Sequence, residues 1–253
     1  RALPVLAGAL ALFAAMRALW FATLSRFATL GYGVLLVTGF HLFVNARIAM
    51  LDIFMAAFVM IALWLFAAAC TARTTARARR NLALAGIAIG CALASKWNTI
   101  PVAPVFGLAF LGIRWRAVGA ARLLTDHQAP PVRGVSLVEA ALWLGLVPVM
   151  VYAITFWPAY VLPKSPFAGL GPIASQEYML GLQMSVKAFH PYQTHWSDWV
   201  LNTRGIWYAF NTYDGAQRGI MLIGNPLTMW LGLVALTWCA YAAVFLRRPD
   251  AAA

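Results

Sequence analysis

The chain has 253 residues, of which 63% are hydrophobic and only 10% are charged, and its mean hydropathy is +0.77. A soluble domain has roughly half apolar and about 25% charged residues, so this composition excludes a soluble enzyme, a disulfide scaffold, a disordered regulator and a coiled coil. A net charge of +12 would suggest nucleic acid as a partner of a soluble protein. In a membrane protein it is typical of arginine-rich cytoplasmic loops, so we expect a polytopic membrane protein with no nucleic-acid partner.

Apolar segments along the chain predict about seven spanning helices, and the expected fold class is therefore an all-α transmembrane bundle. Four of the segments are shorter than the roughly 20 residues that a span requires. The segments are 3–20, 28–43, 50–70, 82–97, 100–114, 136–157 and 225–246. The expected organisation is an N-terminal membrane region (1–157), an outer loop (158–224) and a last membrane helix with a cytoplasmic end (225–253).

Lysine and arginine divide unequally between two alternating sets of connections. Twelve positive residues lie in one set and seven lie elsewhere, most of these in a single long loop. The first set comprises 17–27, 72–81, 114–135 and the C-terminal end. Because positively charged loops stay in the cytoplasm, the opposite side should carry the loops 44–49, 96–100 and 158–224.

The long loop 158–224 is the least apolar part of the chain. Residues 174–189 predict a short helix, with Ser175 as its N-terminal cap. The segment 190–210 that follows is dense in tryptophan and tyrosine. Such density fits a belt at the membrane interface and equally a platform on which a sugar or a peptide stacks.

Charged side chains within or beside membrane helices are costly to place and are therefore candidates for function. Arg47 can bind a phosphate through two parallel hydrogen bonds. Asp52 can bind a metal ion, orient a sugar hydroxyl or pair with Arg47, and a purely structural ion pair between two helices is an equal alternative. Lys96 can supply a point charge for a lipid phosphate, or extend its ammonium to the interface beside Trp97.

The outer loop adds candidates of its own. His190 can donate a hydrogen bond to a phosphate or an acceptor, and Arg204 is a second candidate phosphate ligand. The spacing of His190, His195 and Asp198 matches no zinc pattern and disfavours a metal site there, and Asp52 remains a possible metal ligand. The chain contains no nucleotide-binding or hydrolase motif, which favours an activated lipid as the energy source of any reaction.

Three segments resemble blocks of the protein O-mannosyltransferase family, in the family's order, over about residues 45–235. NARIAMLDIFMAAFVMIALWLF looks like its Arg–Ile–x–x–Leu–Asp segment, and ALASKWNTIPVAP is similar to its next hairpin. HPYQTHWSDWVLNTRGIWYAF, followed by LIGNPLTMWLGL, resembles its C-terminal membrane region with His-Pro-Tyr and Gly-Asn-Pro signatures.

This resemblance implies a membrane glycosyltransferase of the GT-C type in a bacterial inner membrane, with its site on the extracytoplasmic side. Its donor would be a polyprenyl (dolichyl or undecaprenyl) phosphate carrying mannose, and its acceptor a Ser or Thr hydroxyl of a translocated protein, with inversion at the sugar. The family offers no certain cofactor, although a divalent metal ion is possible. The residues implied in binding donor phosphate or sugar are Arg47, Asp52, Lys96, His190, Tyr192 and Arg204.

One departure from the family pattern affects catalysis. The family's catalytic acidic residue follows its first membrane helix, whereas no acidic residue here precedes Asp52. We therefore expect the catalytic residue upstream of Arg1, and a fragment that is inactive alone. The alternatives are a transferase with a lipid acceptor of the lipid A type, a secondary transporter and an inactive partner subunit.

Overall fold

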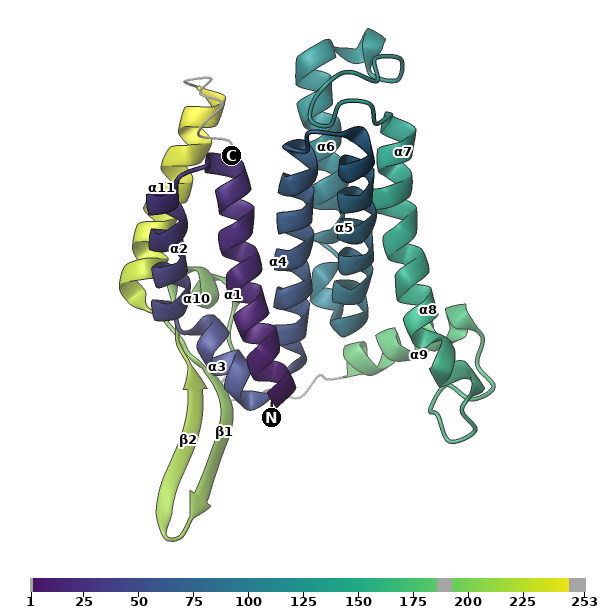
Figure 1. Ribbon diagram of the computed structural model, residues 1–253. Coiled ribbons are helices and arrows are strands. Elements are labelled where there is room, and N and C mark those ends of the chain that lie inside the picture. Colours follow the sequence, from purple (N-terminus) through teal and green to yellow (C-terminus); the bar gives the residue numbers. More distant parts are fainter. Residues whose placement is uncertain (1, 186–192, 246–253) are drawn as a thin grey trace.

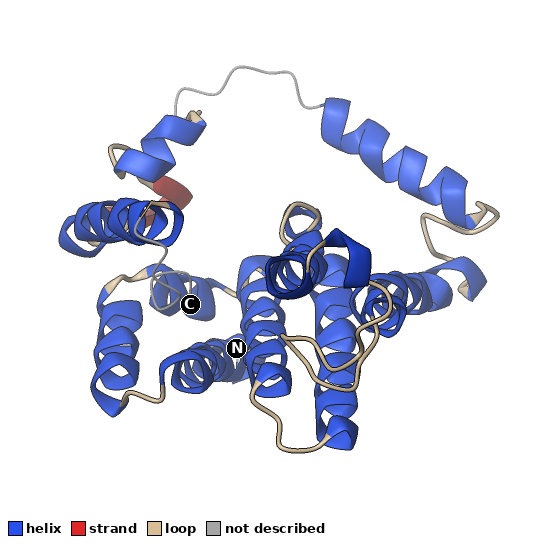
Figure 2. Cartoon of the chain, turned by 90° about the horizontal axis from the view of Figure 1, so that it is seen from above, coloured by secondary structure: helices blue, strands red, loops and turns tan. Residues whose placement is uncertain are grey.

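The computed structural model describes residues 2–185 and 193–245. It is mostly helical, with long helices side by side and one two-stranded hairpin that projects from the end of the bundle (Figure 1). Figure 2, a view from above, shows the long helices close to end-on. The predicted transmembrane helical fold class is confirmed, and the hairpin is an addition to it.

Helices occupy all seven predicted segments. They are α1 (Ala2–Thr23), α2 (Arg26–Thr38), α3 (His41–Ile48), α4 (Leu51–Cys70), α5 (Thr75–Ser95), α6 (Ala103–Val118), α7 (Leu137–Ala141), α8 (Val147–Val161) and α11 (Pro226–Val244). Among the described residues, five helical segments are long and apolar enough to cross a membrane, or six if α2 and α3 form one span. The predicted segment outside this count is α5, which is 21 residues long but begins with arginine-rich turns and is less apolar than the others.

The second predicted span is broken rather than continuous. The axes of α2 and α3 differ by 53°, and Phe40 between them has a left-handed backbone with a φ of 68°. The side chain of Asn225 donates a hydrogen bond to the carbonyl of Thr38 at 3.2 Å. The end of α2 is thereby satisfied from α11, and α3 turns away as a separate short helix.

Several helices begin where the sequence supplies a cap. In each case a polar side chain accepts a hydrogen bond from a first-turn amide, which satisfies one of the unpaired donors at the helix start. The capping residues are Ser25, Thr74, Ser136 and Asn225. Such caps each contribute about 1 kcal/mol, and they fix where α2, α5, α7 and α11 start.

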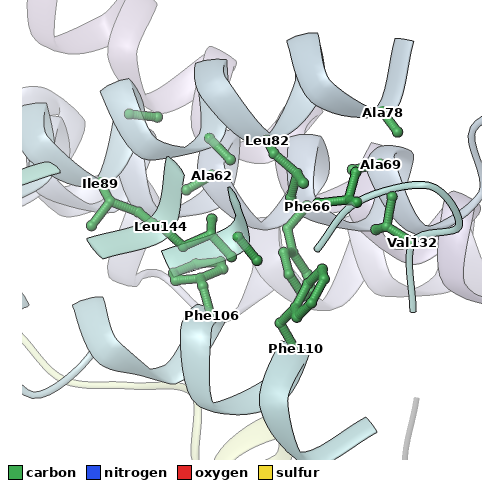
Figure 3. Packing of buried hydrophobic residues seen from close by; sticks show 14 residues of the cluster. Ala62, Phe66, Ala69, Ala78, Leu82, Ile89, Phe106, Phe110, Val132 and Leu144 are labelled. Carbon is green, nitrogen blue, oxygen red and sulfur yellow. The ribbon is translucent and has the colours of Figure 1, made fainter. Parts of the chain in front are cut away.

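The largest buried cluster lies among α4, α5, α6 and the segment that joins α7 to α8 (Figure 3). Phe66 of α4 meets Phe106 of α6 edge to face, with ring centroids 5.9 Å apart. Leu82, Phe110 and Leu144 fill the space around these rings. Since lipid is as apolar as these side chains, close packing rather than water exclusion holds such helices together.

Glycines allow α8 to lie against α5. A Cβ added at Gly90 would be 2.6 Å from Cβ of Val151 and 2.7 Å from the carbonyl oxygen of Pro148, and one added at Gly86 would collide with the carbonyl oxygen of Trp143. Residues 142–146 between α7 and α8 form a widened helical turn. The two glycines, four residues apart, form the small-residue pattern that brings membrane helices into backbone contact.

A buried arginine holds the connection between α6 and α7. Arg114 is fully buried, and its Nη2 atom donates to the carbonyls of Ala129, Val132 and Val135, the last at 2.7 Å. Its guanidinium also lies 4.8 Å from the ring centroid of Phe110. The guanidinium therefore satisfies several loop carbonyls, while its Nη1 is the one buried side-chain nitrogen among the described residues that has no partner.

The long loop forms two short helices and the hairpin: α9 (Pro172–Ser185), α10 (Trp196–Leu201), β1 (Ile206–Tyr213) and β2 (Ala216–Leu222). The predicted helix over 174–189 is present as α9, and residues 186–189 lie outside the described residues. Ser175 does not cap it: this residue is buried inside α9, and its hydroxyl donates to the carbonyl of Pro172. The hairpin turns at Asp214 and Gly215, with φ values of 51° and 73°, which is a favoured two-residue turn.

The two ends of the bundle differ in composition. We call one end the arginine-rich end, where the connections after α1, α4 and α6 lie, and the other the hairpin end, with α3, α9, α10 and the hairpin (Figure 1). Of the connections predicted to share the cytoplasmic side, 17–27, 72–81 and 114–135 lie together at the arginine-rich end, and residues 246–253 lie outside the described residues. The described parts of the loops predicted to lie outside are at the hairpin end.

Candidate functional site

An ion pair joins the ends of α4 and α5 at the hairpin end. Nζ of Lys96 lies 2.7 Å from Oδ1 of Asp52, and the two side chains are 35% and 27% exposed. Asp52 lies in the first turn of α4 and Lys96 directly follows α5, the positions at which helix dipoles favour an anion and a cation. Asp52 therefore pairs with Lys96, and the predicted alternative of an Arg47–Asp52 pair is wrong.

Arg47 lies on the short helix α3, between two residues with left-handed backbones. Phe40 before α3 and Ala49 after it have φ values of 68° and 57°, and such strain in residues other than glycine is often kept at functional sites. The Arg47 guanidinium lies 5.3 Å from the ring centroid of Phe43, and the side chain is exposed. The structure therefore leaves this charge open at the hairpin end, five residues before Asp52.

Tyr208 of β1 belongs to the same region, although the sequence did not single it out. Its hydroxyl donates to Oδ1 of Asn45 at 3.3 Å, and the Asn45 amide donates to the carbonyl of His41 at 2.9 Å. Burial raises the pKa of Tyr208, and the negative charge of Asp52 raises it further. The phenol is bonded to α3, and it stays neutral to a higher pH than an ordinary tyrosine. Only the fold of the hairpin could have shown this.

The Gly-Asn-Pro motif positions the hairpin against α2 and α3. Asn202 after α10 donates to the carbonyl of Gly224 at 2.7 Å and accepts from its amide at 2.9 Å. A Cβ added at Gly224 would be 2.6 Å from Cε1 of His41, so glycine is needed where the chain passes this ring. The motif has a structural role here: it attaches α11 and the hairpin to the break between α2 and α3.

Of the other candidate residues in the loop, Arg204 and Asp198 make hydrogen bonds within the loop itself. Arg204 donates to the carbonyl of Gln193 at 3.0 Å. Asp198 accepts from the amide of His195 at 2.8 Å and from the hydroxyl of Thr203 at 3.0 Å, and these bonds, the backbone one first, lower the pKa of Asp198. That carboxylate therefore stabilises the first turn of α10. His190 and Tyr192 lie outside the described residues.

A chain of hydrogen bonds fixes the turn that carries Lys96. The indole of Trp97 donates to the hydroxyl of Tyr152 at 2.9 Å, and that hydroxyl donates to the side-chain oxygen of Gln176 in α9. These three side chains line a cavity of about 260 Å³ with otherwise apolar walls. Trp97 therefore links α5, α8 and α9, and the turn beside Lys96 cannot rotate freely.

The described residues offer little to a metal ion. Among them, no group of three or more His, Cys, Asp or Glu side chains lies close enough to hold one. The carboxylate of Asp52 is already engaged by an ammonium group. The described residues therefore bring no ligand set for a divalent metal together.

Two family comparisons cover nearly the whole chain. Residues 1–162 match the family described as dolichyl-phosphate-mannose-protein mannosyltransferase. The chain belongs to this family. Residues 172–249 match the C-terminal four TMM region of protein-O-mannosyltransferase, so both halves agree with the resemblance read from the sequence blocks.

Curated relatives agree with this assignment. A polyprenol-phosphate-mannose–protein mannosyltransferase of Mycobacterium tuberculosis (strain ATCC 25618 / H37Rv) is 27% identical over 85% of this chain and 50% of its own length. One of Mycolicibacterium smegmatis (strain ATCC 700084 / mc(2)155) is 23% identical over 85% of this chain and 51% of its own length. The chain thus spans about half the length of the curated relatives it matches. No solved structure matches it.

Proposed function

We propose that this mannosyltransferase-family chain binds a polyprenyl-phosphate mannose donor at its hairpin end, in an enzyme that transfers mannose to Ser or Thr hydroxyls of proteins. The observation that carries the proposal is the Asp52–Lys96 pair, with Tyr208 close enough for the Asp52 charge to act on it and the exposed charge of Arg47 at the same end of the bundle. Two cations and one carboxylate leave a net positive charge there, which suits a phosphate diester. The names of the mycobacterial relatives support the same donor and acceptor.

The chemistry needs a stabilised leaving group. The bond between the sugar C1 and the donor phosphate oxygen breaks, and a bond from C1 to the acceptor hydroxyl oxygen forms on the opposite face, with inversion. The phosphate gains negative charge as it leaves, so a cation aimed at it lowers the barrier. The donor's polyprenyl tail is apolar and stays in the membrane, which places its phosphate at the level of the helix ends.

Each residue then has a distinct role. Arg47 binds the phosphate through its planar guanidinium, and Lys96 adds a point charge whose position Asp52 fixes. Tyr208 offers a hydroxyl to the sugar or the phosphate. His190, Tyr192 and Arg204 are proposed to bind the donor from the outer loop.

Removal of the acceptor's proton requires a base near the hydroxyl. Asp52 is poorly suited, because its carboxylate is held by Lys96. On this proposal the base comes from outside residues 1–253, as the resemblance implies, and the chain alone binds donor without turning it over. The hairpin end faces the extracytoplasmic side of a bacterial inner membrane, in keeping with the charge of the opposite loops.

The test uses the protein in its full natural length, in detergent, with polyprenyl-phosphate mannose and a Ser/Thr-rich peptide. We expect a hexose mass increase on the peptide. We expect Arg47→Ala to lower its rate about tenfold or more, and Arg116→Ala, a matched loss of charge at the arginine-rich end, to leave it unchanged.

Other results of this experiment would favour one of the alternative functions. Mannose appearing on a lipid instead of the peptide would establish a lipid acceptor. Substrate movement into liposomes without any covalent product would establish a transporter. Donor binding without transfer to any acceptor would indicate an inactive partner.

A further inference from the structure

A second charged site lies at the opposite end of the bundle. A groove of about 730 Å³ runs between α1, α4 and α5, and four arginines line it. We call it the arginine groove; its charged residues are Arg17, Arg73, Arg77 and Arg80. No acidic residue is among its lining residues, so the groove carries an uncompensated positive charge.

One of the four arginines, Arg17, lies within a membrane span rather than in a connecting loop. It lies inside the span α1 and is only partly exposed. Its guanidinium lies 4.8 Å from the ring centroid of Phe21 and 5.8 Å from that of Trp64. Those rings orient the guanidinium but do not neutralise it, and Arg17 makes no ion pair with any described residue. A charge inside a membrane span calls for an anionic partner.

A buried amide provides an independent indication of a ligand. Asn81 of α5 lines the groove and is only 6% exposed. No hydrogen bond joins its side chain to another described residue, yet its amide atoms are not among the buried atoms that lack a partner. The residue is therefore enclosed by its neighbours while its amide opens to the groove, where it can bond to a polar group that enters.

The rest of the wall is apolar. Phe21, Leu24, Trp64 and Leu84 border the same space as the four arginines. A ligand that satisfies all of these surfaces has an anionic head and a hydrocarbon tail. Arginine binds phosphate oxygens through paired hydrogen bonds, and basic pockets between membrane helices on the cytoplasmic side are known to take anionic lipid headgroups.

We propose that the arginine groove is a binding site for the phosphate headgroup of an anionic phospholipid from the adjacent leaflet. The headgroup lies against Arg17, Arg77 and Arg80 and accepts from the Asn81 amide, while an acyl chain follows Leu24 and Leu84. The site is separate from the donor site, because it lies at the other end of the bundle. Such a lipid would hold α1 against α4 and α5.

The experiment measures retained lipid. The full-length protein is reconstituted in nanodiscs of phosphatidylcholine with or without phosphatidylglycerol, and lipid that remains after detergent extraction is counted by native mass spectrometry. The double variant Arg77→Gln/Arg80→Gln should retain about tenfold less phosphatidylglycerol than the unchanged protein. The matched control Arg116→Gln/Arg122→Gln removes the same charge, at the same end but outside the groove, and should retain it fully.

A second variant tests whether the shape of the groove matters in addition to its charge. Leu84→Trp narrows the groove without altering any charge, and should also lower phosphatidylglycerol retention. An equal loss in the Arg77/Arg80 variant and in the Arg116/Arg122 control would overturn the proposal in favour of general surface attraction. Full displacement of the lipid by inorganic phosphate would overturn the proposal in favour of a free anion. The absence of retained phosphatidylglycerol in the unchanged protein would also overturn the proposal.

Discussion

Asp52 and Lys96 form an ion pair at the proposed donor site, so their substitution tests a structural role and a proposed functional role together. Their side chains are about two-thirds buried, so the cost of separating them lies between that of an exposed pair and that of a buried pair, about 1–3 kcal/mol. We expect Asp52→Asn and Lys96→Gln each to lower the thermal unfolding midpoint in detergent. Each should also lower mannosyl transfer about tenfold.

The double variant Asp52→Asn/Lys96→Gln distinguishes the two roles of the pair. It leaves no unpaired charge, so most of the lost stability should return. Transfer should stay low, because the cation proposed to face the donor phosphate is still missing. Recovery of transfer together with stability would show that the pair only connects α4 to α5.

The environment of Tyr208 predicts how the stability of the fold depends on pH. Burial and the charge of Asp52 raise its pKa above the ordinary value of 10. The neutral phenol therefore stabilises the fold below about pH 10, and this contribution is lost as the pH rises through the raised pKa. Tyrosinate absorbance of the unchanged protein, minus that of Tyr208→Phe, should titrate with a midpoint above about 10.

Asp52→Asn supplies the control for this titration. Removing the carboxylate removes one cause of the shift, so the Tyr208 midpoint should move downward while remaining raised by burial. A midpoint at or below the ordinary value in the unchanged protein would contradict the placement of Tyr208 beside Asp52.

The sequence identified charged candidates more easily than their partners. Arg47, Asp52 and Lys96 could be singled out because charge is costly beside a membrane span. Their pairing was not accessible, because Lys96 lies 44 residues after Asp52 and meets it only when α4 and α5 pack together. Tyr208 was one of many aromatic residues until the hairpin placed it against α3.

At the level of elements, the contact between α5 and α8 depends on two glycines. We expect Gly90→Ala to destabilise the protein by about 1–3 kcal/mol, because the added methyl group would meet Val151 and the Pro148 carbonyl at 2.6–2.7 Å. Gly86→Ala should be at least as damaging, since its methyl group would come still closer to backbone, the carbonyl oxygen of Trp143. Thermal unfolding in detergent measures both.

Glycines of α6 provide the comparison. A Cβ added at Gly107 or Gly112 would meet nothing within 4 Å, and alanine favours a helix over glycine by about 1 kcal/mol. Gly107→Ala should therefore be neutral or slightly stabilising. If it destabilises as much as Gly90→Ala, helix packing at the α5–α8 contact is not the cause.

The elements that the sequence did not predict depend on distant contacts or on local turn chemistry. The break between α2 and α3 is satisfied by Asn225, which lies 187 residues after Thr38, so a purely local hydropathy pattern merges the two helices. The hairpin did have a local signal, the Asp214-Gly215 pair, which favours a two-residue turn. Its aromatic strands looked like an interfacial belt and hid that signal.

For the molecule as a whole, charge and topology lead to the same arrangement. The arginine-rich connections lie together at one end of the bundle, and the candidate donor site lies at the other (Figure 1). Lys96 and Tyr208, more than a hundred residues apart in the chain, lie at this one end with α3. This separation would give the protein two membrane surfaces with different ligands, a donor at the hairpin end and an anionic phospholipid at the arginine groove.

The arrangement predicts which positions a reagent outside the cell reaches. In a background with Cys70, Cys91 and Cys239 replaced by serine or alanine, a membrane-impermeant thiol reagent should label Asp214→Cys in intact cells or spheroplasts. It should label Arg122→Cys only after the membrane is permeabilised. Both positions are exposed in the structure, so burial does not account for a difference between them. The opposite labelling pattern would place the candidate donor site in the cytoplasm, and a lipid donor presented on the outer face could then not reach Arg47 or Lys96.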